Sequence, residues 1–362
     1  MRTKIEGVTV ECMAAAVSGK WDSIMEISDE DEKVVEQFIR KTGVEGRYSA
    51  SQRQTASDFC FAAAQKIIDS CKLDKNKIGI LVFVSQTSDY RIPATACVLQ
   101  HRLGLSENMI AFDVNLGCSG FVYGLDIVAS IMQNSEAEYG LLLTGDTSAR
   151  EYSAYSKNKT GHTAAYLFGD AGTATLLKKD VAGSIEVELN TNGNGYQAIF
   201  APYCGWRNPD CPIGKGNTSM MDDIEVFNFA TNQVPVQIGK YMSDTGTTPD
   251  SYDCLVLHQA NIMIMKRIAK KTGFAPEKLL ISLNKFANTS SSSIPLTLVN
   301  EYGESKEDET VTALCCGFGV GLSWGTVGVR INKKNILPLV HTDEYYKDGY
   351  NIKDLKENNE ND

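Results

Sequence analysis

The sequence predicts an α/β protein in which helices cover a buried, largely parallel sheet. Short apolar runs of strand length alternate along the chain with longer segments whose apolar residues recur at helical spacing. The run at residues 78–84, IGILVFV, lacks the polar alternation of a half-solvated strand, which favours burial on both faces. Glycine-bearing segments at 168–177 and 317–329 close the two halves of the chain and weakly suggest an internal duplication.

The first half is predicted to alternate helices with strands. Residues 30–41 place apolar side chains at helical spacing, and residues 57–70 form a capped, alanine-rich helix. Pro93 stands at an early position of a helix that extends to residue 103. The remaining elements follow from apolar runs and glycines: strands at 78–84, 110–114 and 139–144, a helix at 119–133, and a hairpin-like turn at 168–177 around Gly169 and Gly172.

The second half repeats this pattern. Residues 225–240 are largely helical, and Pro235 predicts a break or kink inside that helix. From Lys333 the composition changes: residues 343–362 hold seven acidic side chains and three lysines, a net charge of −4, which predicts a tail that is partly docked and then disordered. The other elements are strands at 254–257, 278–282, 310–316 and 322–331 and a helix at 261–272.

Composition and charge narrow the classes of function. The 362 residues are 43% hydrophobic and 22% charged, which is enough for a sizeable core. With 35 basic against 45 acidic residues the net charge is −10, which argues against a chain-wide surface for nucleic acid or anionic membrane. No apolar run approaches the roughly 20 residues that span a bilayer, and Glu6 and Glu11 interrupt any signal peptide.

The ten cysteines include no C-x-x-C pair, so zinc-ribbon and thioredoxin-type sites are excluded and no metal site is predicted. Scattered cysteines in a chain of this size indicate a reducing, cytoplasmic location, in which most of them are small buried hydrophobic residues.

Cys118 is the first candidate for chemistry. It lies in AFDVNLGCSGFVYGL, where a strand, a turn at Gly117 and a helix follow one another. Amide groups at a helix start favour a thiolate. A buried structural cysteine is the alternative, and this pattern alone leaves both open.

His258 is the second candidate because it ends the apolar strand at 254–257 and precedes a helix, where the sites of α/β proteins gather. The alternative is a hydrogen-bonded histidine of the core. The other three histidines have surroundings typical of solvated surface positions: His101, His162 and His341.

Two further segments carry polar or flexible residues between apolar flanks. Asn288 begins the run NTSSSSIP, which either forms a solvated loop or caps a buried helix. The glycines of 317–321 would let backbone amides approach a ligand, but no Lys-Ser/Thr pair follows, so this is not a P-loop. A bulged hairpin is the plain alternative.

Together and in this order, GCSGFVYGL, HQAN, NTSSSSIP and GFGVGLSWG resemble the site motifs of β-ketoacyl-acyl-carrier-protein synthase III, a family of the thiolase superfamily. The resemblance covers about residues 3–331 and includes supporting matches at 41–47, 88–104, 167–177 and 221–230. It implies a thiolase-like five-layered αβαβα sandwich of two similar halves, 1–178 and 179–332, with an acidic extension at 333–362. It also implies a homodimer.

The resemblance assigns the chemistry as well. Cys118 matches the acyl-accepting nucleophile, and His258 and Asn288 match the other members of its triad. The implied reaction is a decarboxylative condensation of an acyl primer on Cys118 with a malonyl thioester on acyl carrier protein. His258 and Asn288 would donate hydrogen bonds to the malonyl thioester oxygen, and the amides of Cys118, Gly319 and Val320 would form the oxyanion hole. No metal and no permanently bound cofactor are implied; the substrates are acyl-CoA or acyl-carrier protein and malonyl-carrier protein.

Some positions depart from the family pattern. Gln37 stands where housekeeping members carry a tryptophan that stacks on coenzyme A, and Lys41 and Met263 replace arginines. Val320 replaces a glycine of the loop. These changes leave open whether the primer arrives on coenzyme A or on carrier protein, and whether the pathway is fatty acid initiation or a specialised one.

Binding surfaces are predicted from the same resemblance. A basic stripe follows the histidine in the helix where the carrier protein docks in the family, and its plain alternative is a solvated helix face. Changing Lys270 and Lys271 to Glu is expected to raise the KM for carrier-bound substrate and to leave the reaction with free thioesters unchanged. Ile92 of the other subunit and Phe318 are expected at the primer pocket. The expected carrier and cofactor contacts are Lys41, Arg150, Lys266, Arg267, Lys270 and Lys271.

Three other readings stay open. An acyltransferase of this fold would pass the Cys118 acyl group to an oxygen or nitrogen nucleophile. A non-catalytic subunit would only bind acyl carrier protein, although the retained triad argues against it. Thiolases use a second cysteine near the C-terminal glycine loop, where Cys315 and Cys316 stand.

Overall fold

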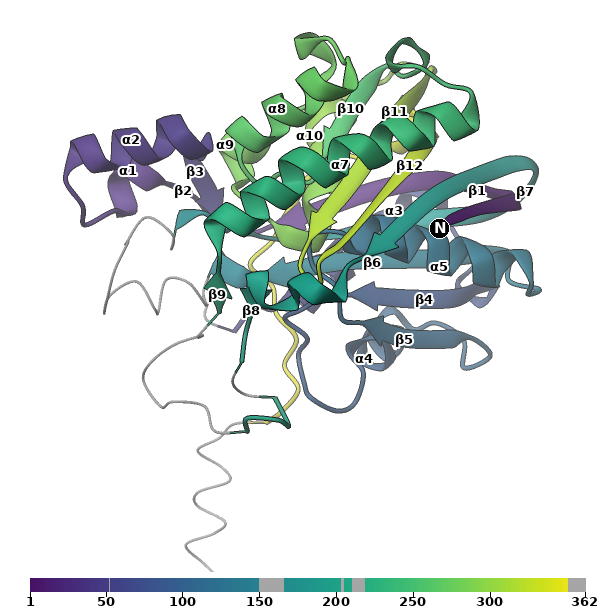
Figure 1. The fold of residues 1–362 in the computed structure, drawn as a ribbon. Coiled ribbons are helices and arrows are strands. Elements are labelled where there is room, and N and C mark those ends of the chain that lie inside the picture. The colour runs from purple at the N-terminus through teal and green to yellow at the C-terminus, as the bar shows by residue number, and fades with distance from the viewer. Residues whose placement is uncertain (52, 150–165, 203–204, 210–218, 351–362) are drawn as a thin grey trace, which may run out of the picture.

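The computed structural model describes residues 1–51, 53–149, 166–202, 205–209 and 219–350 (Figure 1). Its main feature within these ranges is a nine-stranded sheet. The principal order is β10 (Cys254–Leu257), β11 (Thr310–Gly319), β12 (Ser323–Asn332), β7 (Asp170–Thr191), β6 (Tyr139–Thr147), β4 (Ile78–Val84) and β5 (Ile110–Val114), while β1 (Arg2–Val17) lies beside β7 and β13 (Val340–His341) beside β1.

The sheet is mixed, so the expectation of a largely parallel sheet is wrong. β4 pairs in parallel with β5 and β6, and β10 pairs in parallel with β11. The pairs β11–β12, β12–β7, β6–β7 and β1–β7 are antiparallel. Only a short turn joins β11 to β12, and strands without a crossover helix between them pair antiparallel. Because both faces are covered in either case, the apolar pattern does not distinguish the two arrangements.

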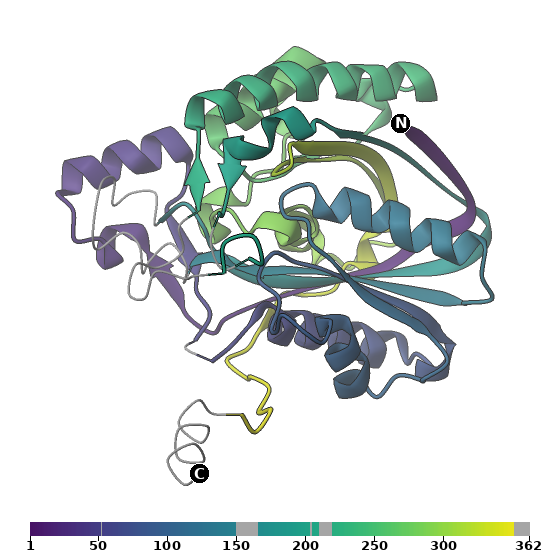
Figure 2. The same ribbon diagram turned by 60° about the horizontal axis from the view of Figure 1, so that its bottom comes forward.

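The helices form three layers, and the strands form the two layers between them. This is the five-layered thiolase-like fold (Figures 1 and 2). α5 (Gly120–Gln133) and α10 (Ser293–Tyr302) lie in the middle. α7 (Asp223–Thr245) and α8 (Ile262–Thr272) cover one outer face, and α3 (Ala56–Cys71) and α4 (Thr95–Leu103) cover the other. Each of the three helix layers has its own buried apolar cluster against the strands, which is what holds the layers together.

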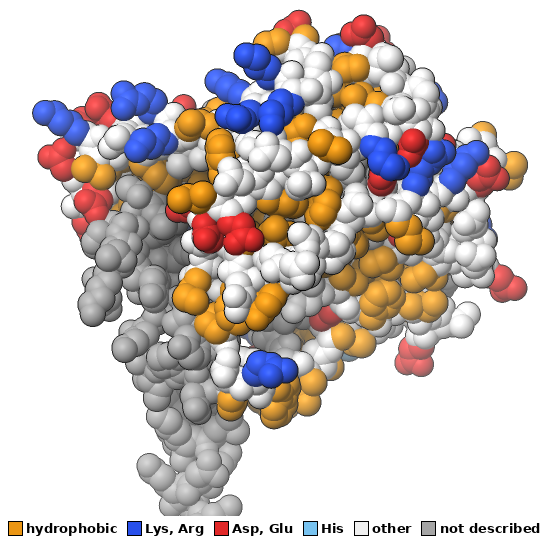
Figure 3. Space-filling view, viewed as in Figure 1, with side chains coloured by type: hydrophobic (Ala, Val, Ile, Leu, Met, Phe, Trp, Pro, Cys, Tyr) orange, Lys and Arg blue, Asp and Glu red, His pale blue; other side chains and the backbone are white. Residues whose placement is uncertain are grey.

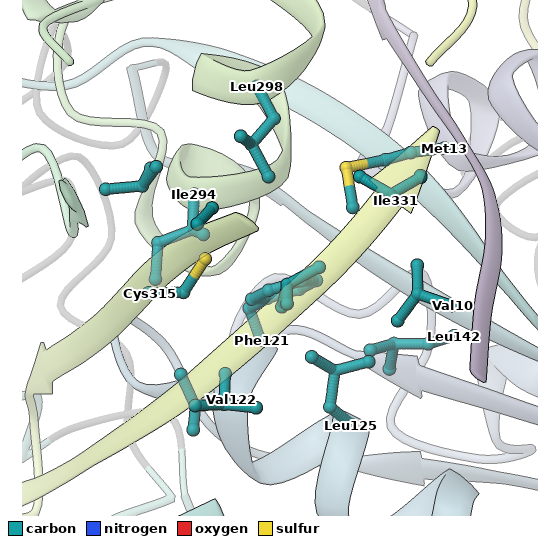
Figure 4. Packing of buried hydrophobic residues seen from close by; sticks show 14 of the residues in the cluster. Val10, Met13, Phe121, Val122, Leu125, Leu142, Ile294, Leu298, Cys315 and Ile331 are labelled. Carbon is teal, nitrogen blue, oxygen red and sulfur yellow. The ribbon is translucent and has the colours of Figure 1, made fainter. Parts of the chain in front are cut away.

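The central cluster is built from α5 and α10 together with side chains of β4, β6, β10, β11 and β12 (Figure 4). Phe121 and Leu125 of α5 and Ile294 and Leu298 of α10 all belong to it, and all four are buried. α5 packs closely because a Cβ at Gly124 would lie only 2.5 Å from the Leu142 side chain. Truncating a buried phenylalanine such as Phe121 to alanine typically costs about 3–5 kcal/mol, so this layer is a major source of stability.

A small subdomain projects from the outer layer on the α8 side, at the left of Figure 1. Its α2 is capped by Asp31 and ends at Gly43, and a Cβ at Gly43 would lie 2.9 Å from Ile262 at the start of α8. The subdomain is therefore held against the helix that follows His258. Its elements are β2 (Trp21–Ser23), α1 (Ile24–Ile27), α2 (Glu32–Thr42) and β3 (Gly46–Tyr48); shorter elements elsewhere are α9 (Leu283–Phe286), β8 (Ile199–Phe200) and β9 (Met220–Met221).

Most predicted elements are present, and two differ in the first half. α4 begins at Thr95 rather than at Pro93, because the Asp113 carboxylate caps it by accepting from the Thr95 and Ala96 amides at 2.6 and 2.7 Å. The hairpin-like turn at 168–177 is absent, because the chain from Asp170 onward forms the continuous strand β7. Gly172 serves close packing instead, since a Cβ there would lie 2.5 Å from the Cys60 amide nitrogen.

Two predictions fail in the second half. α7 continues through Pro235, so a break there is wrong, while a kink stays a prediction; the cap at Asp222 and the buried face sustain one helix from 223 to 245. The expected strand at 278–282 is replaced by a 3-10 turn at Pro276–Lys278 and a single bridge between Leu255 and Leu279.

The described part of the C-terminal extension returns to the body of the molecule. β13 pairs in parallel with β1, and residues 351–362 lie outside the described ranges. β7 crosses the predicted boundary at residues 178 and 179, and the division into domains stays a prediction. No helix in the described part of the chain is both long enough and apolar enough to cross a membrane.

Candidate active site

Cys118 lies in the turn between β5 and α5 and is partly exposed. Its neighbour Ser119 shares a 2.7 Å hydrogen bond with Ser323 of β12, which anchors the turn to the second half of the chain. The end of β11 lies directly against the cysteine: a Cβ at Gly319 would be 2.7 Å from the Cys118 Cβ and 3.0 Å from its Sγ. Position 319 therefore has no room for a side chain unless the thiol moves.

Burial raises the pKa of the Cys118 thiol to about 12, with the nearby Asp146 carboxylate as the second cause. The Cys118 and Val320 amides and the Ser290 side chain act in the opposite direction, because hydrogen bonds to the thiolate lower its pKa. The thiolate-favouring amides expected from the sequence are thus present, but desolvation outweighs them.

His258 follows β10 and is buried. Its amide donates to the Cys316 carbonyl at 2.9 Å, and its Nδ1 lies 2.8 Å from the Ser293 hydroxyl. The ring packs edge-on against Phe318 with centroids 5.6 Å apart. Burial lowers the pKa of His258 to about 3, and a hydrogen bond with the Ser290 backbone only partly offsets this. The imidazole is therefore neutral at physiological pH.

The residue after the histidine holds the segment in place. The Gln259 side chain is fully buried, accepts from the Ser282 and Leu283 amides at 2.9 and 3.2 Å, and donates to the Leu257 carbonyl at 2.8 Å. Asn261 caps α8 by accepting from the Met263 amide at 2.8 Å. The HQAN segment thus contains the predicted triad histidine and two amide side chains that hold the segment in place.

Asn288 is buried and held by the segment that leads into β7. Its amide donates to the Leu167 carbonyl at 2.9 Å, and its carbonyl accepts from the Gly169 amide at 3.0 Å. Its Oδ1 accepts from the Ser290 amide at 2.9 Å. The serine run that follows is buried, as a 3-10 turn at Ser290–Ser292 and the start of α10, so the solvated-loop alternative is wrong here.

Ser290 connects the three predicted triad residues. Its side chain interacts with the Cys118 thiol, its backbone with His258, and its amide with Asn288. It does so in a left-handed backbone conformation, with φ of 51°. Ser290 does not stand out in the sequence, where its one signal is a run of four serines directly before an apolar helix.

Asp146, at the end of β6, is a second residue that sequence reasoning missed. Its carboxylate is fully buried, and desolvation raises its pKa. It joins the serine run to the loop after β4, and its negative charge acts on Cys118. Its hydrogen-bond donors, at 2.7–3.3 Å, are the Gln86 and Ser291 amides and the hydroxyls of Ser85, Thr87 and Ser291.

Cys315 and Cys316, which left a thiolase open in the sequence, have surroundings different from those of Cys118. Cys315 packs in the central cluster and Cys316 in the α7–α8 cluster, both fully buried on β11. Burial raises the pKa of both thiols, to about 12 for Cys316. Both side chains fill cores, so neither is a candidate second thiol beside Cys118.

The remaining predicted residues are distributed outside this cluster. Lys41 on α2 and Lys266, Arg267 and Lys270 on α8 are exposed, and Figure 3 shows Lys and Arg side chains gathered over these two helices. Lys271 differs because its Nζ donates to the Thr231 carbonyl at 2.6 Å and lies 3.1 Å from Asn232 Oδ1, on α7. Ile92 is 86% exposed, away from the Cys118 cluster of its own chain, and Phe318 is buried against His258. Arg150 lies outside the described residues.

Within the described ranges, no group of three or more His, Cys, Asp or Glu side chains is arranged to hold a metal ion.

A five-layered fold with a cysteine at the start of its central helix defines a thiolase-fold enzyme, and comparisons with known proteins narrow this class. Residues 112–193 match the family model of 3-oxoacyl-[acyl-carrier-protein] synthase III, and residues 242–331 match the model of its C-terminal part. A crystal structure of 3-oxoacyl-(acyl-carrier-protein) synthase from Burkholderia xenovorans superimposes with a TM-score of 0.87 at 31% identity, over 94% of this chain and 99% of that one.

Two curated relatives carry the name β-ketoacyl-[acyl-carrier-protein] synthase III. The protein of Acholeplasma laidlawii is 32% identical over 316 residues, or 86% of this chain and 95% of that protein. The protein of Oceanobacillus iheyensis is 32% identical over 308 residues, or 83% and 93%. The chain therefore belongs to the β-ketoacyl-acyl-carrier-protein synthase III family of condensing enzymes.

Proposed function

We propose that the protein joins an acyl primer to a malonyl-type extender held on acyl carrier protein, with loss of carbon dioxide. The observation that carries the proposal is the meeting of Cys118, His258 and Asn288 on one residue, Ser290. A thiol, a neutral imidazole and a carboxamide around one buried turn suit acyl transfer followed by enolate stabilisation.

In the first step the Cys118 thiol attacks the carbonyl of an acyl thioester. The carbon–sulfur bond of the primer breaks, its carrier leaves as a thiol that takes the cysteine's proton, and a Cys118 thioester forms. The Cys118 and Val320 amides, which interact with the sulfur in the free enzyme, are suited to hold the oxyanion of this step. Because burial raises the pKa of Cys118, the protonated thiol is the main form of the free enzyme at neutral pH.

In the second step the malonyl thioester loses carbon dioxide, and its electron pair moves into an enolate. Because Nδ1 of His258 pairs with Ser293, the other ring nitrogen is the one available toward Ser290 and the substrate. A neutral imidazole that accepts at Nδ1 carries its proton on Nε2, and it can donate to the thioester oxygen beside Asn288. The enolate carbon then attacks the acyl group, Cys118 leaves and takes up a proton, and a β-ketoacyl carrier product forms.

The proposal includes the carrier protein as partner. The exposed Lys266, Arg267 and Lys270 on α8, together with Lys41 on the adjacent α2, offer an acidic carrier protein a positive surface on a chain whose net charge is −10. No resident metal or cofactor enters either step.

We also propose a homodimer in the cytoplasm. β5 forms one end of the principal strand order, and partly exposed apolar side chains of β5 and α5 lie together there, among them Phe112, Val114 and Ile127. Hydrophobic side chains gather over this region in Figure 3. An open edge beside an apolar surface suits pairing with a second copy. The eight cysteines among the described residues are all free thiols, which supports a reducing compartment.

The first experiment is intact-protein mass spectrometry after mixing with acyl-CoA and acyl-carrier thioesters, beside Cys118→Ala. An adduct on the wild type alone, followed by carbon dioxide release and a β-keto product with malonyl-carrier protein, is the expected result. An adduct that passes to an alcohol or amine without carbon dioxide release would replace the proposal with an acyltransferase. Absence of any adduct across the panel would favour a carrier-binding subunit.

A further inference from the structure

The segment 336–350 extends beyond residue 331, where the match to the family models ends, and it lies against α3 and the loop that precedes it. Gln54 Nε2 donates to the Thr342 and Glu344 carbonyls at 2.8 and 3.1 Å. The Asp343 carboxylate accepts from the Gly19 amide at 2.9 Å. Backbone groups of the segment are therefore paired with side chains of the folded body, and we call residues 336–350 the C-terminal brace.

Arg102 of α4 fixes the brace to two helices. Its guanidinium lies 4.7 Å from the ring centroids of both Phe61 of α3 and Tyr346 of the brace. It forms an ion pair with Asp58 at 2.8 Å, and the same Asp58 oxygen accepts from the Tyr346 amide at 2.9 Å. The Arg102 side chain is only 8% exposed, so a cation held between two rings and a carboxylate makes this a firm attachment.

The same network reaches the loop 85–94 between β4 and α4, which we call the arm. The Arg102 guanidinium also donates to the Ser57 hydroxyl at 2.9 Å, and Ser57 donates to Asp89 of the arm at 2.7 Å. A second and direct link joins Tyr90 of the arm to Asp348 of the brace at 2.5 Å. The brace thus holds the arm through Arg102 and through Tyr90.

The two ends of the arm have different surroundings. At its base, Ser85, Gln86 and Thr87 donate to the buried Asp146 carboxylate near Cys118. At its other end, Ile92 is 86% exposed. An apolar residue presented to solvent at the end of a braced loop is suited to enter a neighbouring molecule.

We infer that the C-terminal brace positions the arm, and that the Tyr90–Asp348 contact thereby sets the primer length that the paired subunit accepts. The inference rests on the proposed function and its homodimer, and on the expectation from the sequence that Ile92 enters the primer pocket of the other subunit. Tyr90 and Asp348 are positioning residues, since they act through Ile92. A change in the direction of the arm would move Ile92 and so lengthen or shorten that pocket.

The test uses the full-length protein with Tyr90→Phe, Asp348→Ala and the double variant. Tyr350→Phe is the matched control, because its side chain is 82% exposed and only its backbone amide bonds to Asp348. Hydrogen exchange is read on peptides covering residues 85–94. Primer preference is read as the ratio of Cys118 adducts formed from an equimolar mixture of acyl thioesters from acetyl to octanoyl.

Each single variant is expected to speed exchange in the arm by about two- to tenfold, as loss of one hydrogen bond allows, and to shift the adduct ratio by a similar factor. The double variant is expected to match the single ones, because both substitutions remove the same contact. Tyr350→Phe is expected to behave as wild type. Rescue of the wild-type ratio by Asp348→Glu, which restores an acceptor for Tyr90, would strengthen the assignment.

Unchanged exchange in the arm would overturn the inference, and so would faster exchange spread evenly over the whole molecule. Faster arm exchange with an unchanged adduct ratio would overturn the role in primer length. A wild-type protein that forms no adduct would contradict the proposed function and the primer role together, while the exchange data would still decide whether the brace holds the arm.

Discussion

The interior of the candidate site and the basic surface of α8 are built differently. Inside, Cys118, His258 and Asn288 are each fixed by hydrogen bonds or close contacts to backbone, and Gly319 packs against the thiol. Outside, Lys266 and Lys270 extend from α8 into solvent. Interior geometry is therefore sensitive to a single methyl group, whereas the surface acts through summed charge and tolerates change.

Among the substitutions in the interior, Gly319→Ala is expected to have the largest effect on the reaction. Its Cβ would lie 3.0 Å from the Cys118 Sγ, so the thiol or the β11 backbone must shift. A shift of the thiol by about 1 Å is expected to lower the rate of acyl loading about 100-fold. The matched control is Gly193→Ala, where an added Cβ meets nothing within 4 Å. The measurement is the rate of adduct formation by intact mass, with circular dichroism to check folding. Equal rates in both variants would contradict close packing at position 319.

Ser293→Ala separates the two steps of the reaction. It removes the partner of His258 Nδ1 at 2.8 Å, which holds the ring and its tautomer, but it does not contact Cys118 in the described hydrogen bonds. Condensation is expected to slow about tenfold, as when the supporting bond of a site histidine is lost, while acyl loading keeps its wild-type rate. Carbon dioxide release and adduct formation are measured side by side. A matching loss in loading would show that His258 takes part in the first step.

The pH dependence of Cys118 alkylation tests whether the pKa of this thiol is raised. Because the pKa of Cys118 is raised to about 12, its thiolate is scarce at neutral pH and increases with pH. Iodoacetamide alkylation of Cys118 is expected to rise about tenfold per unit between about pH 6 and pH 10 without levelling. Ser290→Ala removes an interaction that lowers this pKa and should slow alkylation several-fold at each pH, whereas Ser243→Ala on the exposed face of α7 should not. A plateau near neutral pH would contradict a raised pKa.

The smallest effect is expected at the surface. Because Lys271 is bonded to α7, its substitution would disturb helix packing as well as charge, and Lys270 is the better probe. Lys270→Glu is expected to raise the KM for carrier-bound substrate about threefold at low salt and to leave free thioesters unaffected. Lys306→Glu makes the same charge change at another exposed position and serves as control. Identical KM changes in the two variants would indicate a general charge effect instead of a docking surface.

The sequence predicts the three triad candidates better than it predicts the residues that hold them in place. Cys118, His258 and Asn288 stand out because each ends or begins an apolar element, and short motifs preserve that order. Ser290 and Asp146 do not stand out, since their importance lies in contacts between segments more than 100 residues apart, such as Ser291 with Asp146. The triad roles stay predictions until they are tested by substitution.

Fold prediction from the sequence has a similar limit. Strands at 78–84, 110–114 and 254–257 are found where they were expected, because compact apolar runs carry a strong local signal. Strand direction was predicted wrongly, because it depends on connections and partners rather than on the run itself. The start of α4 was missed because its cap, Asp113, comes from the following strand and not from the preceding residues.

The pairing of β1 with β7 also constrains how the chain folds during its synthesis. Arg2 pairs with Glu188 and Ala16 with Gly172, so the first strand must wait for its partner until about half of the chain has been made. At roughly 5–20 residues per second a ribosome takes about ten to forty seconds to cover that distance. During this interval a 16-residue strand with a largely apolar second half lacks its partner. Chaperone dependence of the nascent chain should therefore end shortly after residues 170–191 emerge.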